Sequence, residues 1–463
     1  MSPTWSPVIV GAGPAGVRAA QTLARAGLKP IVIDEAARAG GQIYRQPPAG
    51  FVRDKRALYG SEHRKADAVH RAMDELADRI DYRPGTLVWN GEDGMLDLMR
   101  DGVSTEVPYR HLIIATGATD RVLPFPGWLT PGVYTLGGSQ VALKYQGCAI
   151  GTAVVFLGTG PLLYLVAYQY ARAGARVAAV LDTANTRDRL RGLPGMLAAP
   201  ALLARGMFYM AWLRAHGVPL HGGVRPVRVL GSERVTGLVW RDASGAERRT
   251  ECDAVGYGLA LRAETQLAAL AGCEFDFSPR DRNWLPRRDA AGRGSVRGVY
   301  LAGDCSGIAG ADAAELAGER AALAVLQDMG LPFDARRATA LERRLARIGR
   351  IRDALERAFP FPDDWARAIG DDVVLCRCEE ITAGTLRATA ASGAAREMNR
   401  LKALTRVGMG RCQGRMCGAG ATEVLAHTLG VAPSEVGRLR NQPPIKPIPI
   451  TLRVAEPDTG GSP

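Results

Sequence analysis

The sequence is poor in the residues that usually mark metal sites, disulfides and nucleophilic triads. It has only six histidines, none at metal-ligand spacing from another, and it shows no Ser-His-Asp arrangement. No Cys-x-x-Cys pair occurs between residues 7 and 326. The cysteines of the first two thirds of the chain stand alone: Cys148, Cys252, Cys273 and Cys305. This excludes a redox dithiol there and is typical of buried thiols in a reducing compartment.

The chain also lacks an uninterrupted apolar segment of membrane-spanning length. Residues 148–171 contain no charged residue and would suffice on length alone. Gly158, Gly160 and Pro161 interrupt them, so we interpret them as a buried parallel strand that turns into a helix. No signal peptide precedes the first predicted strand. We expect a cytoplasmic protein without a transmembrane segment, and contact with the inner face of the membrane stays open.

Positive charge is in excess and is carried almost wholly by arginine. The net charge of +12 suits nucleic acid, an acidic partner protein or an anionic cofactor. No basic block is interleaved with aromatic residues, so we predict no nucleic-acid binding. With 463 residues, of which 47% are apolar, the chain can bury the cores of about three domains.

A glycine-rich turn follows the first apolar strand, which covers residues 8–10. In the turn, Gly11 permits the tight bend, Gly13 lets a pyrophosphate approach the backbone, and Gly16 lets the following helix pack closely on the strand. The N-terminus of that helix offers free amides and a partial positive charge to phosphates. The sequence therefore predicts a nucleotide site here.

The rest of the unit agrees with this interpretation. Residues 17–26 are predicted as a helix and residues 29–33 as the second strand. Asp34 closes that strand and is placed to bind a ribose hydroxyl, with Glu35 as the alternative.

A second unit of the same kind starts near residue 153. Gly158 and Gly160 match the turn, but Leu163 stands at the third glycine position. Asp182 follows the next strand, where it suits a ribose 2′-hydroxyl and would repel a 2′-phosphate. NAD or another adenine nucleotide fits this pattern better than NADP. A retained fold with an empty or structural nucleotide site is the alternative.

Two further segments separate flavin from nicotinamide. Residues 111–118 run from an apolar strand into Ala115-Thr116-Gly117, and residues 299–304 form a strand that ends in Gly303-Asp304. Here the chain resembles the two-dinucleotide-binding-domain flavoproteins, the glutathione reductase and thioredoxin reductase class, over residues 7–326. The resemblance implies bound FAD.

In that family the aspartate of the Gly-Asp pair holds the ribityl chain, and the next helix points its N-terminus at the isoalloxazine ring. The resemblance assigns these roles to Asp304 and to the amides after Gly310. Cys305 beside it is a small buried residue or, alternatively, a reactive thiol. The predicted cofactor contacts are Gly11, Gly13, Ala15, Gly16, Asp34, Glu35, Gly41, Gln42, Val88, Ala115, Thr116, Gly117, Gly303, Asp304, Gly310 and Ala311, with Gly158, Gly160 and Asp182 in the second unit.

Four cysteines near the C-terminus form two close pairs, Cys376 with Cys378 and Cys412 with Cys417. Four thiolates brought together by a small domain make a metal–sulfur cage. Neighbouring glycines let backbone amides donate to the sulfurs, and neighbouring arginines offset the negative charge: Arg406, Arg411 and Arg415. Zinc is the rival to iron, although its cages favour two-residue gaps.

The sequence around these cysteines, over residues 376–382 and 401–418, resembles the BFD-type [2Fe–2S] domain. A thioredoxin-reductase-like unit joined to such a domain resembles the α-type subunits of heteromeric amine and imino-acid dehydrogenases. These include the A-type chains of octopine and nopaline oxidases, the HcnB-type chain of hydrogen cyanide synthase, and the α chains of D-hydroxyproline and L-proline dehydrogenases. The resemblance covers residues 7–439. It implies a flavoprotein β partner, related to D-amino-acid oxidases, that oxidises the C–N bond.

Three functions are compatible with this assembly. The first is the electron-transfer subunit of such a dehydrogenase, for which the resemblance also implies a small ferredoxin-like γ chain and leaves FMN at a subunit interface open. The second is a self-contained NADH-dependent reductase of a ferredoxin-like acceptor. The third is a non-catalytic regulator that senses redox state or iron through the cluster.

The predicted fold class is α/β, with two Rossmann-like domains and a small helical [2Fe–2S] domain. Leu341, Leu345, Ile348, Ile351 and Leu355 lie on one stripe of a predicted helix over 334–359. Its arginines suit a solvated face or, alternatively, a docking surface. The expected domains are 1–128 with 256–330 for FAD, 129–255 for the second nucleotide unit, 331–368 for a linker helix, 369–440 for the cluster, and 441–463 for a Pro-rich tail.

Overall fold

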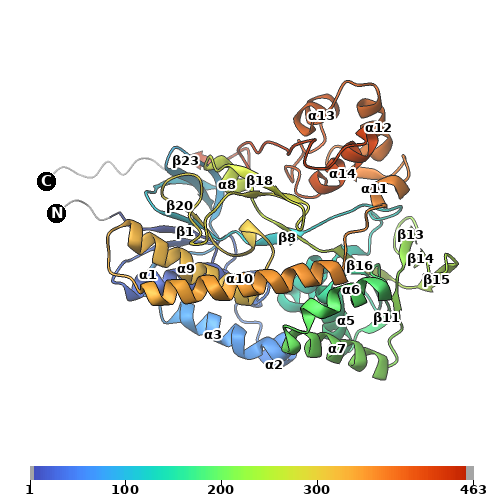
Figure 1. The fold of residues 1–463 in the computed structure, drawn as a ribbon, viewed down its shortest axis with the longest axis horizontal. Coiled ribbons are helices and arrows are strands. Elements are labelled where there is room, and N and C mark those ends of the chain that lie inside the picture. The colour runs from blue at the N-terminus through green and yellow to red at the C-terminus, as the bar shows by residue number, and fades with distance from the viewer. Residues whose placement is uncertain (1–4, 455–463) are drawn as a thin grey trace.

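The computed structural model describes residues 5–454, and Figure 1 shows its arrangement. The first unit is built on a parallel five-stranded sheet in the order β20-β7-β1-β2-β3. Its strands are Val299–Leu301, Leu112–Ile114, Val8–Val10, Ile31–Ile33 and Asp81–Arg83. Because β20 comes from residues beyond the second unit, the second unit is inserted in the first, as the sequence predicts.

Period-two alternation decides what each face of this sheet buries. On one side Ile9, Val32 and Ile113 pack on helices α1 (Pro14–Arg25), α3 (His63–Asp74) and α9 (Ala311–Asp328). On the other side Val8 and Val10 face a sheet in the order β23-β6-β5-β4. Its strands are Arg453–Val454, Val103–Pro108, Met95–Arg100 and Leu87–Glu92. Both faces of the parallel sheet are therefore covered.

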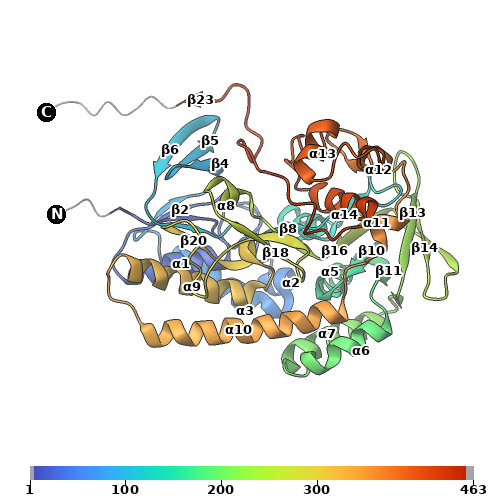
Figure 2. The same cartoon turned by 45° about the horizontal axis from the view of Figure 1, so that its top comes forward.

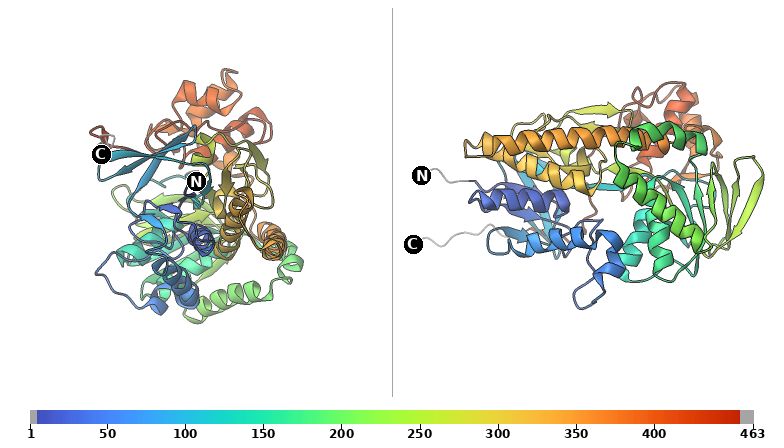
Figure 3. Two further views of the ribbon diagram at one scale, coloured as in Figure 1. Left: turned by 90° about the vertical axis from the view of Figure 1, so that its left-hand side faces the viewer. Right: turned by 60° about the horizontal axis from the view of Figure 1, so that its bottom comes forward.

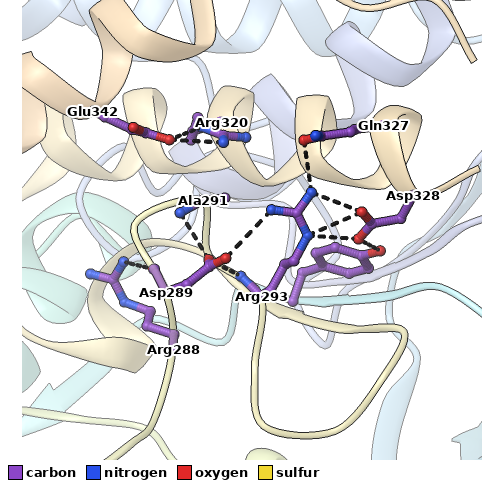
Figure 4. A network of polar contacts seen from close by, with 9 residues as sticks. Arg288, Asp289, Ala291, Arg293, Arg320, Gln327, Asp328 and Glu342 are labelled. Carbon is purple, nitrogen blue, oxygen red and sulfur yellow. Dashed lines mark hydrogen bonds and ion pairs between the residues drawn. The ribbon is translucent and has the colours of Figure 1, made fainter. Parts of the chain in front are cut away.

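Helices α1 and α9 lie side by side (Figure 3). An added Cβ at Gly318 of α9 would lie 1.9 Å from the carbonyl oxygen of Ala15, so only glycine permits this approach. A polar network fixes the C-terminal end of α9: Arg293 binds Asp289 and Asp328, and Asp328 lies 2.8 Å away (Figure 4). The N-terminus of α9 is thereby held over the edge of the first sheet.

The second unit contains a five-stranded sheet in the order β12-β11-β10-β16-β9. Its strands are Leu220–Gly222, Arg176–Asp182, Ala153–Thr159, Ala254–Leu259 and Val133–Thr135, with α5 (Pro161–Arg172) and α7 (Pro200–Ala215) on one side. The uncharged segment 148–171 thus holds a strand and a helix, as predicted. The predicted domain boundary at 255/256 is wrong: β16 pairs along its whole length with β10, so the chain leaves this unit after Leu259.

Helix α10 (Ala335–Ala358) matches the predicted linker helix, and the Asp334 side chain caps it by accepting a hydrogen bond from the Arg337 amide. It lies along α9 and reaches α6 (Thr186–Met196) of the second unit (Figure 3). Its residues Ala354 and Ala358 pack on glycines of α6. The linker therefore braces the two units against each other.

The C-terminal domain sits above the second unit (Figure 2). It comprises α11 (Trp365–Ala368), β21 (Val374–Cys376), β22 (Ile381–Thr382), α12 (Ala383–Ala391), α13 (Met398–Thr405) and α14 (Gly418–Leu429). One continuous core joins it to the second sheet and to residues 122–128. The indoles of Trp128 and Trp365 donate across this contact to the carbonyls of Val374 and Pro124, at 2.8 and 2.9 Å.

After this domain the chain returns to the first unit. Ile445 is buried between β4 and the parallel sheet, and its amide donates to the carbonyl of Trp89. The end of the tail, Arg453–Val454, adds strand β23 beside β6. The arm predicted to pack on another surface thus packs on this chain, and residues 455–463 of the predicted tail lie outside the described part.

Shorter elements complete the described chain. They are α2 (Lys55–Tyr59), β8 (Ala118–Asp120), α4 (Leu136–Val141), β13 (Arg225–Leu230), β14 (Gly237–Arg241), β15 (Glu247–Glu251), β17 (Leu261–Ala263), α8 (Gln266–Leu270), β18 (Phe275–Ser278) and β19 (Asn283–Pro286), with 3-10 turns at Gly60–Glu62 and Gly303–Ser306 and a π turn at Ala142–Gln146. Between residues 5 and 454, no helix is both long and apolar enough to cross a bilayer.

Candidate functional site

The first glycine turn forms a cradle that no larger residue would fit. An added Cβ at Gly16 would lie 1.7 Å from the carbonyl oxygen of Gly11, and one at Gly11 would lie 2.3 Å from that of Ala115. Gly41 has a positive φ of 62°, and its added Cβ would lie 2.9 Å from Gly13. The structure thus brings the predicted turn, the 40–42 segment and the 115–117 segment together.

Helix α1 begins at this cradle without a side-chain cap. Gly13 is its N-cap and offers no oxygen to the first amides, whereas Asn185 caps α6 with its side chain. Uncapped amides at a glycine turn are available to a pyrophosphate and carry the positive end of the helix dipole. The cradle therefore fits the pyrophosphate of a dinucleotide.

Asp34 and Glu35 lie at the edge of this cradle. The Asp34 carboxylate accepts hydrogen bonds from the amides of Ala12 and Ala36, at 2.5 and 2.7 Å. Burial raises the pKa of Asp34, against these two hydrogen bonds. Glu35 is more exposed and forms an ion pair with Lys446 of the returning tail, 2.5 Å away. Asp34 is thus built into the turn, and the tail reaches the nucleotide side of the unit.

A second uncapped helix start lies where β20 ends. Gly310, with a φ of 88°, is the N-cap of α9 and precedes Ala311. Before it, the Asp304 carboxylate accepts hydrogen bonds from the amides of Ala309 and Gly310, at 2.9 and 3.0 Å, and burial raises its pKa. Gly303 lies against Ala15 of α1. The predicted ribityl-side and pyrophosphate-side residues therefore belong to one continuous surface.

Three other predicted contacts have different environments. Gln42 is exposed and accepts a hydrogen bond from Arg45 at 2.9 Å. The Val88 side chain is buried in the core between the two sheets, which leaves only its backbone for the predicted contact. Cys305 is buried, its thiol donates to the carbonyl of Ile114, and burial raises its pKa to about 12. Such a thiol packs as a small apolar residue and is not activated.

The four C-terminal cysteines come together as predicted, and none forms a disulfide. Their side chains are linked in a row, Cys376 to Cys417, Cys417 to Cys412, and Cys412 to Cys378. In the described part of the chain no three ligand side chains surround one point as for a single metal ion. Four thiolates joined in pairs are the ligand set of a two-iron cluster.

Hydrogen bonds favour the thiolate form at two of these sulfurs. The bond from Cys417 lowers the pKa of Cys412 to about 5, helped by the amides of Met416 and Gly414. The bond from Cys417 likewise lowers the pKa of Cys376 to about 6, with the amide of Gly408 among its donors. The glycines of this segment act as the sequence predicts, by bringing amides to the sulfurs.

The arginines around the cluster loop (residues 410–417) differ in their surroundings. Arg411 is exposed, and Arg406 is largely exposed and pairs with Glu379 at 2.7 Å. Arg415 is instead buried and pairs with buried Glu264 of the first unit, also at 2.7 Å. Of the three predicted to offset the thiolate charge, one is thus part of a domain contact.

The second glycine turn keeps its backbone and loses its acid. Gly160 caps α5 with a φ of 95°, and an added Cβ there would meet nothing within 4 Å. Asp182, however, is fully buried: its carboxylate accepts hydrogen bonds from Tyr164 at 2.7 Å, Arg189 at 2.9 Å and the Ala184 amide at 2.9 Å. Its oxygens are therefore already used inside the protein.

The isolated cysteines are mostly buried, as expected, and Cys148 is the exception because it is exposed. Sequence reasoning missed Arg262, Glu264 and Gln266, which meet the cluster loop from the first unit. Their polar–apolar alternation in a short strand carries no cofactor signal. Only their place in the fold reveals them.

Two family models match the chain. The pyridine nucleotide-disulphide oxidoreductase model covers residues 5–318, and the BFD-like [2Fe-2S] binding domain model covers residues 374–427. The chain belongs to the pyridine nucleotide-disulphide oxidoreductase family. This flavoprotein family implies FAD in the first unit, and the second model implies a [2Fe–2S] cluster on the four cysteines. The geometry above fits both groups.

The relatives confirm the resemblance to the α-type subunits. The A subunit of opine oxidase from Agrobacterium tumefaciens is 34% identical over 100% of this chain and 95% of its own length. Hydrogen cyanide synthase subunit HcnB of Pseudomonas protegens is 36% identical over 96% of this chain and 97% of its own length. The flavoprotein is thus related along its full length to subunits of oxidases and synthases, and it is an oxidoreductase.

Solved structures confirm the fold class. L-proline dehydrogenase from P. horikoshii superposes with a TM-score of 0.72 and 21% identity, over 97% of this chain and 79% of that chain. Thioredoxin reductase from T. acidophilum superposes with a TM-score of 0.52 and 22% identity, over 70% of this chain and 98% of that one. The second comparison covers the two nucleotide units without a counterpart for the whole chain.

Proposed function

We propose that this flavoprotein is the electron-transfer subunit of a heteromeric dehydrogenase whose substrate carries a CH–NH group, as in an amine, an imino acid or an opine. A partner flavoprotein β chain would oxidise the C–N bond. This chain would pass the electrons through its FAD and its [2Fe–2S] cluster. The naming of full-length relatives as subunits of opine oxidase and hydrogen cyanide synthase supports this proposal.

The observation that carries the proposal is the direct connection between the flavin turn and the cluster loop. The Thr116 hydroxyl donates to the Glu264 carbonyl at 2.8 Å, and the Glu264 amide donates to the Gly117 carbonyl at 2.9 Å. The Glu264 side chain binds Arg415, between two cluster cysteines. One residue therefore joins both sites, as a chain that moves electrons between two cofactors requires.

The cysteine chemistry agrees with this route. Cys305, the cysteine nearest to the predicted flavin contacts in sequence, is buried and forms no disulfide. The described chain thus shows no dithiol beside Asp304 that could accept electrons from the flavin. The cluster cysteines are the remaining acceptor site next to the flavin turn.

Purification from the native host tests the proposal. We expect a β chain related to D-amino-acid oxidases to co-purify, with a small ferredoxin-like γ chain where the complex contains one. Quantified flavins, iron and sulfide would show FAD and the cluster in this chain and any FMN at the subunit contact. The isolated chain should not oxidise amines or imino acids, while the complex should. Oxidation by the isolated chain at the rate of the complex would contradict the proposal.

An NADH-dependent reductase is the second candidate, because the uncapped glycine turn at Gly160 remains open to a pyrophosphate. Buried Asp182 speaks against it, since its oxygens serve Tyr164 and Arg189. Anaerobic stopped flow decides: rapid bleaching of the flavin by NADH would favour the reductase, and an unchanged flavin spectrum would exclude it.

A further inference from the structure

A buried group of charges lies between the flavin turn and the cluster loop. We call Arg262, Glu264 and Arg415 the bridge triad. The side chains of Glu264 and Arg415 are only 10% and 13% exposed. Arg262 lies in β17, which pairs with β8 directly after the 115–117 turn. The triad thus occupies the contact through which the two cofactor sites communicate.

Each member of the bridge triad reaches the cluster loop. The Arg262 guanidinium donates to the carbonyls of Gly414 and Arg415, at 3.2 and 3.1 Å. An added Cβ at Gly418, next to Cys417, would lie 3.7 Å from Nη1 of Arg262. Glu264 holds the Arg415 guanidinium at 2.7 Å. Gln266 adds a hydrogen bond to the Gln413 carbonyl at 2.8 Å.

Two cations against one carboxylate leave a net positive charge beside Cys412 and Cys417. Because these groups are removed from water, their interaction with the sulfurs is screened less than that of an exposed arginine. Arg406 provides the contrast, since its side chain is 66% exposed. The triad therefore places a weakly screened charge on the flavin side of the cysteines.

We propose that the bridge triad sets the reduction potential of the cluster and holds the cluster loop against the flavin turn. The inference rests on the proposed electron-transfer function and names positioning residues for it. In this step one electron leaves the reduced flavin and one ferric iron becomes ferrous, without a bond being formed or broken. Each electron received adds one negative charge to the sulfur-lined space.

The signs of the individual contributions follow from that added charge. Arg262 stabilises the reduced form and so raises the potential, whereas Glu264 destabilises it and lowers the potential. Removing the two charges singly must therefore shift the potential in opposite directions. A role limited to packing gives no reason for opposite signs.

Redox titration of the purified full-length chain, followed by the EPR signal of the reduced cluster with dithionite as reductant, tests the proposal. We expect Arg262→Gln to lower the potential and Glu264→Gln to raise it, each by about a tenfold change in the oxidised-to-reduced ratio, which is about 59 mV for one electron. Arg406→Gln is the matched control, because it removes an exposed arginine near the cluster. It should shift the ratio clearly less.

Shifts of the same sign in the two variants, or shifts no larger than that of Arg406→Gln, would overturn the proposal. Arg262→Lys keeps the charge and should restore the potential, so a shift as large as that of Arg262→Gln would also overturn it. This comparison decides the question if Glu264→Gln fails to retain its cluster. Because dithionite supplies the electrons, the test needs no β chain, and its failure is distinct from failure of the dehydrogenase proposal.

Discussion

The two nucleotide units share a strand–glycine turn–helix–strand design and a terminal aspartate, yet they use the aspartate differently. In the first unit Asp34 accepts only backbone amides and lies at the edge of the cradle. In the second unit Asp182 is fully buried under Tyr164 and Arg189. Side chains that are absent from the first turn close the second one. The same fold can therefore keep a nucleotide cradle or turn its parts into core.

The third glycine position shows the same divergence. Gly16 touches the Gly11 carbonyl so closely that no side chain fits, while Leu163 is fully buried against the second sheet. The second unit has gained a different contact, because its core continues into the cluster domain through Trp128 and Trp365. The comparison indicates that the first unit serves the cofactor and that the second serves as a platform.

The largest expected effect is that of Gly16→Ala in the first unit. The added Cβ would lie 1.7 Å from the Gly11 carbonyl oxygen, so α1 must move and the cradle opens, at a cost of more than about 3 kcal/mol. We expect loss of bound FAD, measured by flavin absorbance of the purified chain. Gly160→Ala is the control, as its Cβ meets nothing within 4 Å, and FAD should stay. Equal FAD contents in both variants would break the comparison.

Trp365→Ala tests whether the second unit is the platform. This change removes a buried indole and its hydrogen bond to the Pro124 carbonyl, at a cost of about 3–5 kcal/mol. We expect the cluster domain to become sensitive to protease and to lose iron while FAD is retained, as shown by limited proteolysis and by iron and flavin assays. Loss of FAD together with iron would argue against separate roles for the two units.

Asp182→Ala removes the acid of the second unit. Breaking a fully buried ion pair costs about 3–5 kcal/mol, and the partly exposed Arg189 should reduce this to about 2–3 kcal/mol. We expect lower stability in urea denaturation with unchanged FAD content, whereas Asp34→Asn should weaken FAD binding. NADH affinity that disappears on Asp182→Ala would instead show that this carboxylate binds a nucleotide.

The smallest effect concerns pH and distinguishes the first unit again. Burial lowers the pKa of His70 below its usual 6.5, and its Nε2 lies 2.9 Å from the Tyr44 carbonyl, next to Gly40. Below pH 6.5 the unfolded chain binds more protons than the folded one, so stability is present above that pH and falls as the pH drops, by at most about 1.4 kcal/mol per unit. Denaturation at pH 5.5 and 7.5 measures it.

His70→Gln should flatten this pH dependence. His216 of the second unit is exposed, and His216→Gln should leave the dependence as it is. A slope that survives in His70→Gln would assign the effect to another group.

The sequence predicted the parts of the site that depend on local patterns. Gly11, Gly16 and the cysteine pairs are recognisable because turns and ligand spacing are local requirements. The bridge triad was not predicted, because Glu264 and Arg415 meet only after the chain has passed through the second unit. Asp182 was misleading for the same reason: Tyr164 and Arg189 use its oxygens, and nothing in its spacing reveals them.

The most direct test of the account follows electrons through the reconstituted complex. Rapid-freeze EPR after anaerobic mixing with the amine substrate should show the reduced [2Fe–2S] signal within one turnover, together with flavin bleaching in a parallel optical trace. Flavin bleaching without any cluster signal over many turnovers, or zinc in place of iron in the purified chain, would contradict it.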